Sequence, residues 1–416
     1  MATSSAAHPP IVVVGAGAAG LVAAIFARRG QHPVVLLEAT RDGGRKILVS
    51  GGGRCNVLPS ELAPERFVTA SSVHTLKKML LSWPLAEQRR FFEREVGVPL
   101  ALEASTGKLF PASNRARDVR DGLLRLAREH GVELRCGAAV TDLEPPHGPG
   151  GTWTVRAAGV EPIQASAVVV ATGGLSMPGT GSDGTGLEFL RRLGHTVKPT
   201  YPALVPLLAD PAPHAHLAGI SLDVTLRARG HRRATETGGF LFTHHGYSGP
   251  AVLNLSHLAV LSRIAGGPLQ PIEVQWTQLD ATAWRSELAS GPGLVVSSLR
   301  RVLPDRLAEQ LLAECEMPLD QARSRLGRPE RHRLIEVLTA YRLPWTGDEG
   351  YARAEVTGGG IELEDVEPRT MESRSHLRLH LCGEVLDAFG PIGGHNFAWA
   401  WATGRAAGLG AARSPG

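Results

Sequence analysis

The stretch from Ile11 to Gly20 constrains the fold most strongly. It reads IVVVGAGAAG, a short β-branched run followed at once by a GxGxxG pattern. Such a run predicts a buried strand of a parallel sheet, and the glycines predict a turn into a helix. Gly15 would permit the tight turn, Gly17 would let a pyrophosphate approach the backbone, and Gly20 would let helix and strand pack closely. This order of elements predicts a dinucleotide-binding α/β domain.

An acidic residue ends the next predicted strand. Residues 33–37 are apolar, and Glu38 follows them, eighteen residues after Gly20. A carboxylate in this place can accept hydrogen bonds from both ribose hydroxyls of an adenosine. It would repel a 2′-phosphate, so Glu38 favours FAD or NAD over NADP.

The segment 43–56, GGRKILVSGGGRCN, follows Glu38 closely and combines bare backbone with cations. We expect Arg45, Lys46 and Arg54 to supply positive charge for a diphosphate, a ribityl chain or an anionic substrate. No Walker A pattern can be read through it. The alternative is a mobile glycine loop with solvated cations.

Two later segments are expected at the same edge of the sheet. The glycine loop 171–186 follows the apolar run AVVVA, and carboxyl ends of parallel strands meet at one edge. Near the C-terminus, HLCGE precedes Asp387, two glycines and an apolar helix from Asn396. The N-terminus of such a helix would stabilise negative charge on a reduced flavin ring. His395 would add to this effect if protonated, and a structural histidine is the equal alternative.

The chain is expected to form a discontinuous nucleotide-binding domain, residues 1–195 and 352–416, around an insert. Residues 196–280 and 342–351 alternate like strands, and residues 281–341 show a helical pattern. In the first part we expect a helix over about 114–130, capped by Ser113 and stopped by Gly131, and strands over 132–140 and 153–157.

Composition excludes several classes of function. The net charge of +4 is too small to indicate a nucleic-acid-binding protein. Four scattered cysteines predict reduced thiols in a cytoplasmic protein, with no metal site. The uncharged run 11–27 lacks a preceding basic segment, so it is a poor signal peptide, and it is short for a membrane span. We expect no membrane partner, and a monomer or homodimer.

The stretch 242–250, FTHHGYSGP, holds two histidines and a tyrosine. Adjacent strand residues point to opposite faces, so at most one histidine would face a cleft. One of His244, His245 and Tyr247 is a candidate proton donor near a flavin, and a satisfied polar turn is the alternative.

Together these motifs resemble the bacterial NAD(P)/FAD-dependent oxidoreductases often called the YhiN-like or BaiN-like family. The matching text is VVGAGAAGL, GRKILVSGGGRCN, GKLFPASNRARDV, ATGG, LFTHHGYSGPAVLNLS, VTGGG and CGEVLDAFGPIGGHNFAWAWATG, within residues 11–408. A description of the aminoacetone-oxidase type also fits this resemblance. The segment DAFGPIGGHNFAWAW departs from the DVDGYTGGYNLQWAW pattern associated with the family, which leaves the substrate open.

The resemblance implies a Rossmann-like FAD-binding domain, a β-barrel-like insert and a small helical subdomain. It implies bound FAD, with NADH or NADPH as a transient reductant, and hydride transfer from flavin N5 to a small unsaturated or carbonyl-type acceptor. The alternatives are a flavoprotein acting on RNA and a non-catalytic flavin-binding partner protein. Substrate-side candidates are Arg54, Lys108, His245, Tyr247 and His395. By motif, the cofactor should contact Gly15, Gly17, Gly20, Glu38, Arg45, Lys46, Gly173, Gly174, Glu384, Asp387, Gly393, Gly394 and Asn396; the full expected set adds Ala18, Ala19, Gly52, Arg54, Ala139, Val140, Ala171, Thr172 and Gly383.

Overall fold

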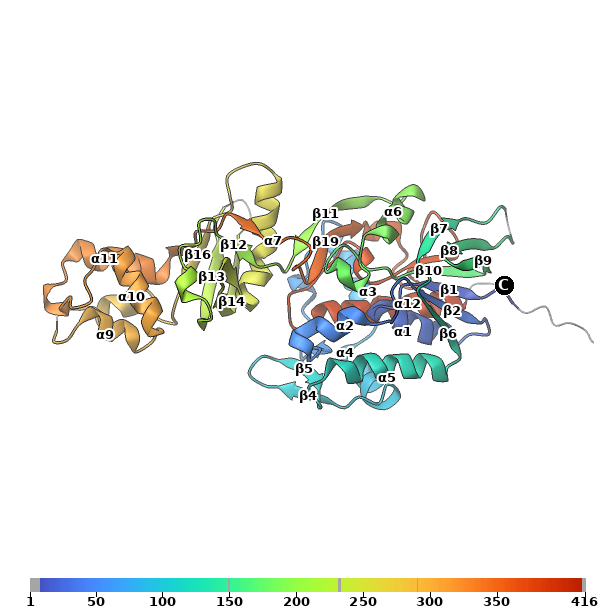
Figure 1. Ribbon diagram of the computed structural model, residues 1–416, viewed down its shortest axis with the longest axis horizontal. Coiled ribbons are helices and arrows are strands. Elements are labelled where there is room, and N and C mark those ends of the chain that lie inside the picture. The colour runs from blue at the N-terminus through green and yellow to red at the C-terminus, as the bar shows by residue number, and fades with distance from the viewer. Residues whose placement is uncertain (1–7, 149, 231–232, 290, 414–416) are drawn as a thin grey trace, which may run out of the picture. The chain divides into compact units, whose positions relative to one another are not determined.

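Five strands form one parallel sheet. In the computed structural model, which describes residues 8–413 other than 149, 231, 232 and 290, the strands lie in the order β20-β10-β1-β2-β6 (Figure 1). Every pairing between neighbours is parallel. The strands are β1 (Ile11–Val14), β2 (Val34–Glu38), β6 (Val132–Cys136), β10 (Ala167–Val170) and β20 (Leu379–Leu381). This sheet confirms the predicted Rossmann-like α/β fold class.

Four strands of this sheet end at the same level. Val14 pairs with both Leu37 and Val170, and Val170 pairs with Leu381. The residues that follow these four therefore begin their loops at one edge. The register of the strands alone therefore brings four segments together: the glycine turn after Val14, Glu38, the loop from Ala171 to Gly174 (the ATGG loop) and the segment from Cys382 to Glu384.

Two helices from opposite ends of the chain pack against each other beside this sheet. They are α1 (Ala18–Ala27) and α12 (His395–Ala412). A Cβ atom on Gly404 would lie 2.5 Å from the Ala19 carbonyl oxygen, and one on Gly408 would lie 2.2 Å from that of Ala23. Because both contacts advance by four residues, the helices run parallel, and both N-termini point toward the carboxyl edge of the sheet.

Shorter elements complete this first unit, which comprises residues up to Pro202 and from Glu355 onward. Its other helices are α2 (Arg45–Val49), α3 (Val73–Leu80), α4 (Leu85–Arg90), α5 (Ala116–Glu129) and α6 (Thr185–Arg192). Two antiparallel sheets are formed by β3 (Leu58–Pro59), β5 (Lys108–Pro111) and β4 (Leu100–Glu103), and by β7 (Val140–Glu144), β8 (Trp153–Ala157) and β9 (Val160–Ala165). A further pair joins β11 (Val197–Ala203) to β19 (Val356–Ile361).

Two predicted boundaries are wrong. The helix α5 begins at Ala116, because Asn114 has a left-handed backbone with φ of 55°, so Ser113 is not its N-cap. Gly131, with φ of 76°, does follow its end. The strand expected over 132–140 stops at Cys136, because Gly137 turns the chain with φ of 72°.

The second unit, Ala203–Ala354, holds a seven-stranded antiparallel sheet in the order β17-β16-β13-β14-β15-β12-β18. Its first and last strands, β17 (Tyr341–Arg342) and β18 (Gly347–Asp348), are separated by four residues in sequence, so the sheet curls toward a barrel. The others are β12 (Leu207–Leu208), β13 (Ser221–Ala228), β14 (Ala234–Phe242), β15 (Gly246–Ser248) and β16 (Ile272–Gln275).

Five helices accompany this sheet: α7 (Pro250–Ile264), α8 (Ala281–Glu287), α9 (Val295–Arg300), α10 (Asp305–Glu314) and α11 (Arg328–Thr339). Trp276, which directly follows β16, and Leu334 of α11 lie in one buried hydrophobic cluster. The helices and the sheet therefore share a core. The separate helical subdomain over 281–341 stays a prediction. Among the described residues, no helix is both long and apolar enough to cross a bilayer.

The contact between α1 and α12 gives a stability prediction. Gly408→Ala should lower the free energy of unfolding by about 1–3 kcal/mol in urea denaturation, because the added methyl group overlaps the Ala23 carbonyl. In a helix interior, alanine is normally more stabilising than glycine, so helix propensity alone would predict a more stable Gly408→Ala protein, the opposite of the destabilisation expected here. Gly267→Ala, at a position with no atom within 4 Å, is the control. A Gly408→Ala protein as stable as the parent would contradict this packing.

Candidate functional site

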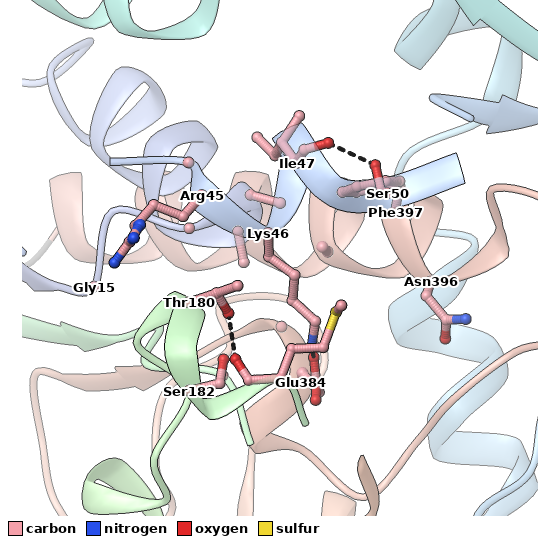
Figure 2. A pocket seen from close by; sticks show the side chains of 18 of the residues that line it. Gly15, Arg45, Lys46, Ile47, Ser50, Thr180, Ser182, Glu384, Asn396 and Phe397 are labelled. Atoms are coloured by element: carbon pink, nitrogen blue, oxygen red, sulfur yellow. Dashed lines mark hydrogen bonds and ion pairs between the residues drawn. The ribbon is translucent and has the colours of Figure 1, made fainter. Parts of the chain in front are cut away.

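A cavity of about 500 Å³ lies at the carboxyl edge of the parallel sheet, entirely within the first unit. Figure 2 shows part of it, with α2 along one side and residues from both ends of the chain around it. The expected residues that line it are Gly15, Gly17, Ala18, Ala19, Glu38, Arg45, Lys46, Arg54, Lys108, Ala139, Val140, Ala171, Thr172, Gly173, Gly383, Glu384, Gly393, Gly394 and Asn396.

The start of α1 forms one wall. No side chain caps this helix, and its first internal hydrogen bond runs from Leu21 N to the Gly17 oxygen. The N–H groups before Leu21 are therefore available to an anion. A Cβ on Gly17 would meet no atom within 4 Å, whereas one on Gly20 would lie 1.8 Å from the Gly15 oxygen. Gly17 thus borders open space, and Gly20 serves packing alone.

Glu38 is fixed before any ligand binds. Its Oε2 accepts a hydrogen bond from Ala16 N at 2.8 Å, and its Oε1 accepts from Thr40 N and Thr40 Oγ1 at 2.8 and 2.7 Å. A carboxylate offers about four acceptor positions, so capacity remains for a ribose hydroxyl. These three donors hold the ionised carboxylate at the edge of the cavity.

A polar network joins four distant segments beneath the cavity. Lys46 of α2 forms an ion pair of 2.5 Å with Glu384 (Figure 2). Lys46 also donates to the hydroxyl of Ser176, which donates to Glu384. Thr357 of β19 donates to Glu384 Oε1 from its N–H at 3.0 Å and from its hydroxyl at 2.9 Å. Lys46 is therefore committed to a protein carboxylate rather than to solvent.

Thr357 also orders the ATGG loop. Its Oγ1 accepts hydrogen bonds from Leu175 N at 2.7 Å and Ser176 N at 3.1 Å. A Cβ on Gly174 would lie 2.4 Å from this oxygen, so only glycine fits there. Gly174 therefore supports the site without lining it.

The N-terminus of α12 forms the opposite end of the cavity. Gly394 is its N-cap with φ of 90°, and no side chain caps the helix. Gly393, Gly394 and Asn396 line the cavity. The Asn396 side chain is paired with Gly390, donating to its oxygen at 2.9 Å and accepting from its N–H at 2.8 Å. The Asn396 amide is thus committed to Gly390, whereas the backbone N–H groups before Ala398 are available to an anion.

Burial and, to a lesser extent, the nearby Arg66 lower the pKa of His395 to about 4. The imidazole is therefore neutral at neutral pH, and it does not add the positive charge that a protonated ring would bring. His395 lies outside the residues that line the cavity, and its ring contacts Phe67 edge-on.

Arg54 reaches the cavity with its donors largely engaged. Its guanidinium lies 3.9 Å above the Phe110 ring and donates to Asn114 Oδ1 at 3.0 and 2.9 Å and to Glu103 Oε1 at 3.0 Å. This explains the left-handed Asn114 seen before α5. Lys108 approaches the start of α12, since a Cβ on Gly393 would lie 3.7 Å from its Cε.

Asp387 lies outside the residues that line the cavity, and its contact with the cofactor stays a prediction. Its buried carboxylate accepts hydrogen bonds from Ala70 N at 2.9 Å, Ser71 Oγ at 2.7 Å and Thr69 Oγ1 at 3.1 Å. These bonds fix the loop before α3. Gly20, Gly52 and Gly174 also lie outside the lining.

The candidates from the second unit differ in burial. Tyr247 is fully buried, and its hydroxyl is hydrogen-bonded to His214 Nδ1 at 2.8 Å. His214 Nε2 in turn contacts Glu314 Oε1 at 2.9 Å. This satisfied network gives Tyr247 a structural role within its own unit. His244 and His245 are exposed.

Several site residues escaped sequence reasoning. Ser176 and Thr357 carry the network around Glu384, and Glu355 lines the cavity just before β19. Asn56, which no pattern singled out, places a side-chain oxygen without a hydrogen-bond partner at the cavity wall, within the described part of the chain, and so does the expected Thr172. The VTGGG motif was the only available signal for Thr357, and no pattern pointed to Glu355.

The network gives a second stability prediction. Thr357→Val keeps the side chain's shape but leaves a buried and a partly buried N–H group without their acceptor, which should cost about 1–3 kcal/mol in urea denaturation. Thr154→Val, which removes a hydroxyl bonded to the exposed Gln164, should leave stability nearly unchanged. Equal stability of both variants would show that Thr357 does not hold the loop.

Similarity to known proteins agrees with this geometry. The HI0933-like protein Rossmann domain family matches residues 9–410. A 3-dehydro-bile acid delta(4,6)-reductase of Clostridium scindens is 32% identical over 97% of this chain and 99% of that protein. A ribosomal RNA dihydrouridine synthase of Escherichia coli is 32% identical over 94% of this chain and 95% of that protein.

Solved structures show the same fold. The 3-ketosteroid-delta4-(5alpha)-dehydrogenase from Rhodococcus jostii, in complex with 4-androstene-3,17-dione, aligns with a TM-score of 0.52 at 16% identity over 97% of both chains. The open conformation of a flavocytochrome c3 fumarate reductase aligns with a TM-score of 0.51 at 15% identity over 98% of this chain and 78% of that one. The family match spans nearly the whole chain and confirms the resemblance found in the motifs. The chain therefore belongs to the HI0933-like Rossmann-domain family, and it is an oxidoreductase.

Proposed function

We propose that this protein uses FAD to reduce a carbon–carbon double bond conjugated to a carbonyl group. The observation that carries the proposal is the convergence of two uncapped helix N-termini and Glu38 on one cavity. The names of the bile acid reductase and the dihydrouridine synthase describe related chemistry. The 3-dehydro-bile acid named in the first has double bonds conjugated to its 3-oxo group. Dihydrouridine, named in the second, is uridine with its conjugated ring double bond saturated.

The residues present fit FAD in extended form. Glu38 would bind the ribose of the adenosine half, and the N–H groups of α1 would bind the diphosphate beside Gly17. The cavity then continues past Lys46 to Gly393 and Gly394. The flavin ring would lie there, where the N-terminus of α12 favours negative charge.

FAD supplies the redox chemistry when bound, by accepting and passing on two electrons. The protein orients the cofactor and excludes competing reactions. The positive end of α12 is worth about 0.3–1 kcal/mol when exposed and about 2 kcal/mol when partly buried. Such an effect tunes the flavin potential but does not create the reactivity.

The reductant is a further part of the proposal. A second GxGxxG string, residues 179–184, does not follow a strand directly, and Thr180, Gly181 and Asp183 within it line the same cavity. It offers no separate dinucleotide site, so NADH or NADPH would bind transiently. A cytoplasmic location is also proposed, supported by four cysteines that are all free.

A uridine within RNA is the second candidate substrate, and a basic cavity favours it. This cavity, about 670 Å³, lies beside the C-terminal half of α12, about 15 to 27 Å along the helix from its start. Glu367 is the single acidic residue among its described lining residues. Clustered cations bind phosphates even when the net charge of a chain is small, so the expected absence of nucleic acid stays open. The cations are Lys78, Arg369, Arg374, Arg405 and Arg413.

Cofactor binding can be separated from folding at two glycines. Gly17→Val should leave unfolding within about 1 kcal/mol of the parent but strongly reduce flavin absorbance per protein, because the valine side chain would fill the diphosphate space. Gly20→Ala should instead destabilise the fold. Gly179→Val, where the surroundings are equally open but outside the cavity lining, is the matched control. Full flavin content in the Gly17→Val protein would show that the diphosphate does not bind at this turn.

The substrate class can be tested in single turnovers. The flavin of the purified protein would be reduced photochemically without oxygen and mixed with a cyclic enone, an isolated alkene or a uridine-containing rRNA fragment. We expect the enone to reoxidise the flavin and the isolated alkene not to. Reoxidation by rRNA alone, lost at high salt, would favour the RNA candidate. No reoxidation by any of them would contradict the proposed function.

A further inference from the structure

Five carboxylates line the main cavity, and four of them have partners. Glu38 accepts from Ala16 and Thr40, and Glu384 is bound to Lys46 and its neighbours. Glu103 accepts from Arg54, and Asp183 accepts from Thr185 N at 3.0 Å. Glu355 is the fifth. It has no hydrogen-bond or ion-pair partner among the residues that the structure describes, so it alone is uncommitted.

Glu355 faces the cavity from the residue just before β19. The side chain is open to water in the cavity, but it lies deep enough that desolvation by the surrounding protein raises its pKa. Lys46 of α2 and Lys108 of β5 are the charged groups that oppose this shift. Lys46 is already paired with Glu384, which weakens its effect on Glu355.

The position of Glu355 relates it to the flavin end of the cavity. Two residues further on, Thr357 is bonded to Glu384. Lys108, which interacts electrostatically with Glu355, reaches the start of α12 at Gly393. A ligand filling the cavity would displace water from Glu355 and further favour its neutral, protonated form.

We propose that Glu355 is the general acid that protonates the substrate during its reduction, an inference that rests on the proposed function. The conjugated double bond gains a hydride, supplied by the reduced cofactor, at the carbon remote from the carbonyl. The Glu355 O–H bond breaks and a C–H bond forms at the carbon next to the carbonyl. The resulting carboxylate regains a proton from water, and a dihydronicotinamide restores the two electrons to the cofactor. The same balance holds for an enone and for uridine.

The test compares Glu355→Gln with the parent in the FAD-loaded protein. Flavin content and the rate of flavin reduction should be unchanged. Reoxidation by the enone should slow by about 10²–10⁴-fold, the typical contribution of general acid catalysis. The parent's reoxidation rate should be highest below the Glu355 pKa and fall as the pH rises through it, because only the protonated acid donates. That limb of the pH profile should be absent in Glu355→Gln.

Two variants and one spectrum keep the outcomes distinct. Glu355→Asp should retain the pH limb at a reduced rate, and Glu161→Gln, at an exposed surface position on β9, should match the parent. Without substrate, the flavin spectrum of the parent should titrate with Glu355, and that of Glu355→Gln should not. A Glu355→Gln protein with the parent's rate and pH limb would overturn the acid role alone. A parent that no unsaturated carbonyl reoxidises would overturn the proposed function and the acid role together.

Discussion

The close approach of α1 and α12 is the constraint on which the site depends. Glycine at 404 and 408 lets the two backbones pass at distances that no side chain would permit. The helices are consequently parallel, and α12 extends beyond the start of α1 by more than two turns. Two helices that lie almost 380 residues apart in sequence thus direct their positive ends into one space.

Aligned dipoles and clustered cations repel one another when no anion is present, and the protein offsets this with carboxylates that line the cavity. Glu384 neutralises Lys46, and Glu103 neutralises Arg54. Glu38 is satisfied by backbone N–H groups instead of a cation. A ligand with its own diphosphate and ribose therefore meets a site that is already ordered, which reduces the entropy lost on binding.

Much of this arrangement could be predicted from the sequence. The GxGxxG turn, Glu38, the ATGG loop and the C-terminal GG follow local rules of strand, turn and helix, and the parallel register then places them together. What failed depended on tertiary contacts. Asn114 lies outside the helix, where its side chain accepts hydrogen bonds from Arg54, sixty residues away in sequence. Asp387 lies outside the cavity lining and is bonded to Thr69 and Ser71, which belong to a loop with no recognisable motif. No sequence pattern marked Glu355, because what distinguishes it is that it has no hydrogen-bond or ion-pair partner among the residues that the structure describes.

The central claim is that segments from both ends of the chain enclose one FAD. A crystal structure of the protein with FAD tests it most directly. The account predicts the adenosine ribose beside Glu38, the diphosphate at the N-terminus of α1, and the flavin ring at the N-terminus of α12. Electron density for FAD elsewhere, or a protein crystallised with excess FAD that binds none, would contradict it.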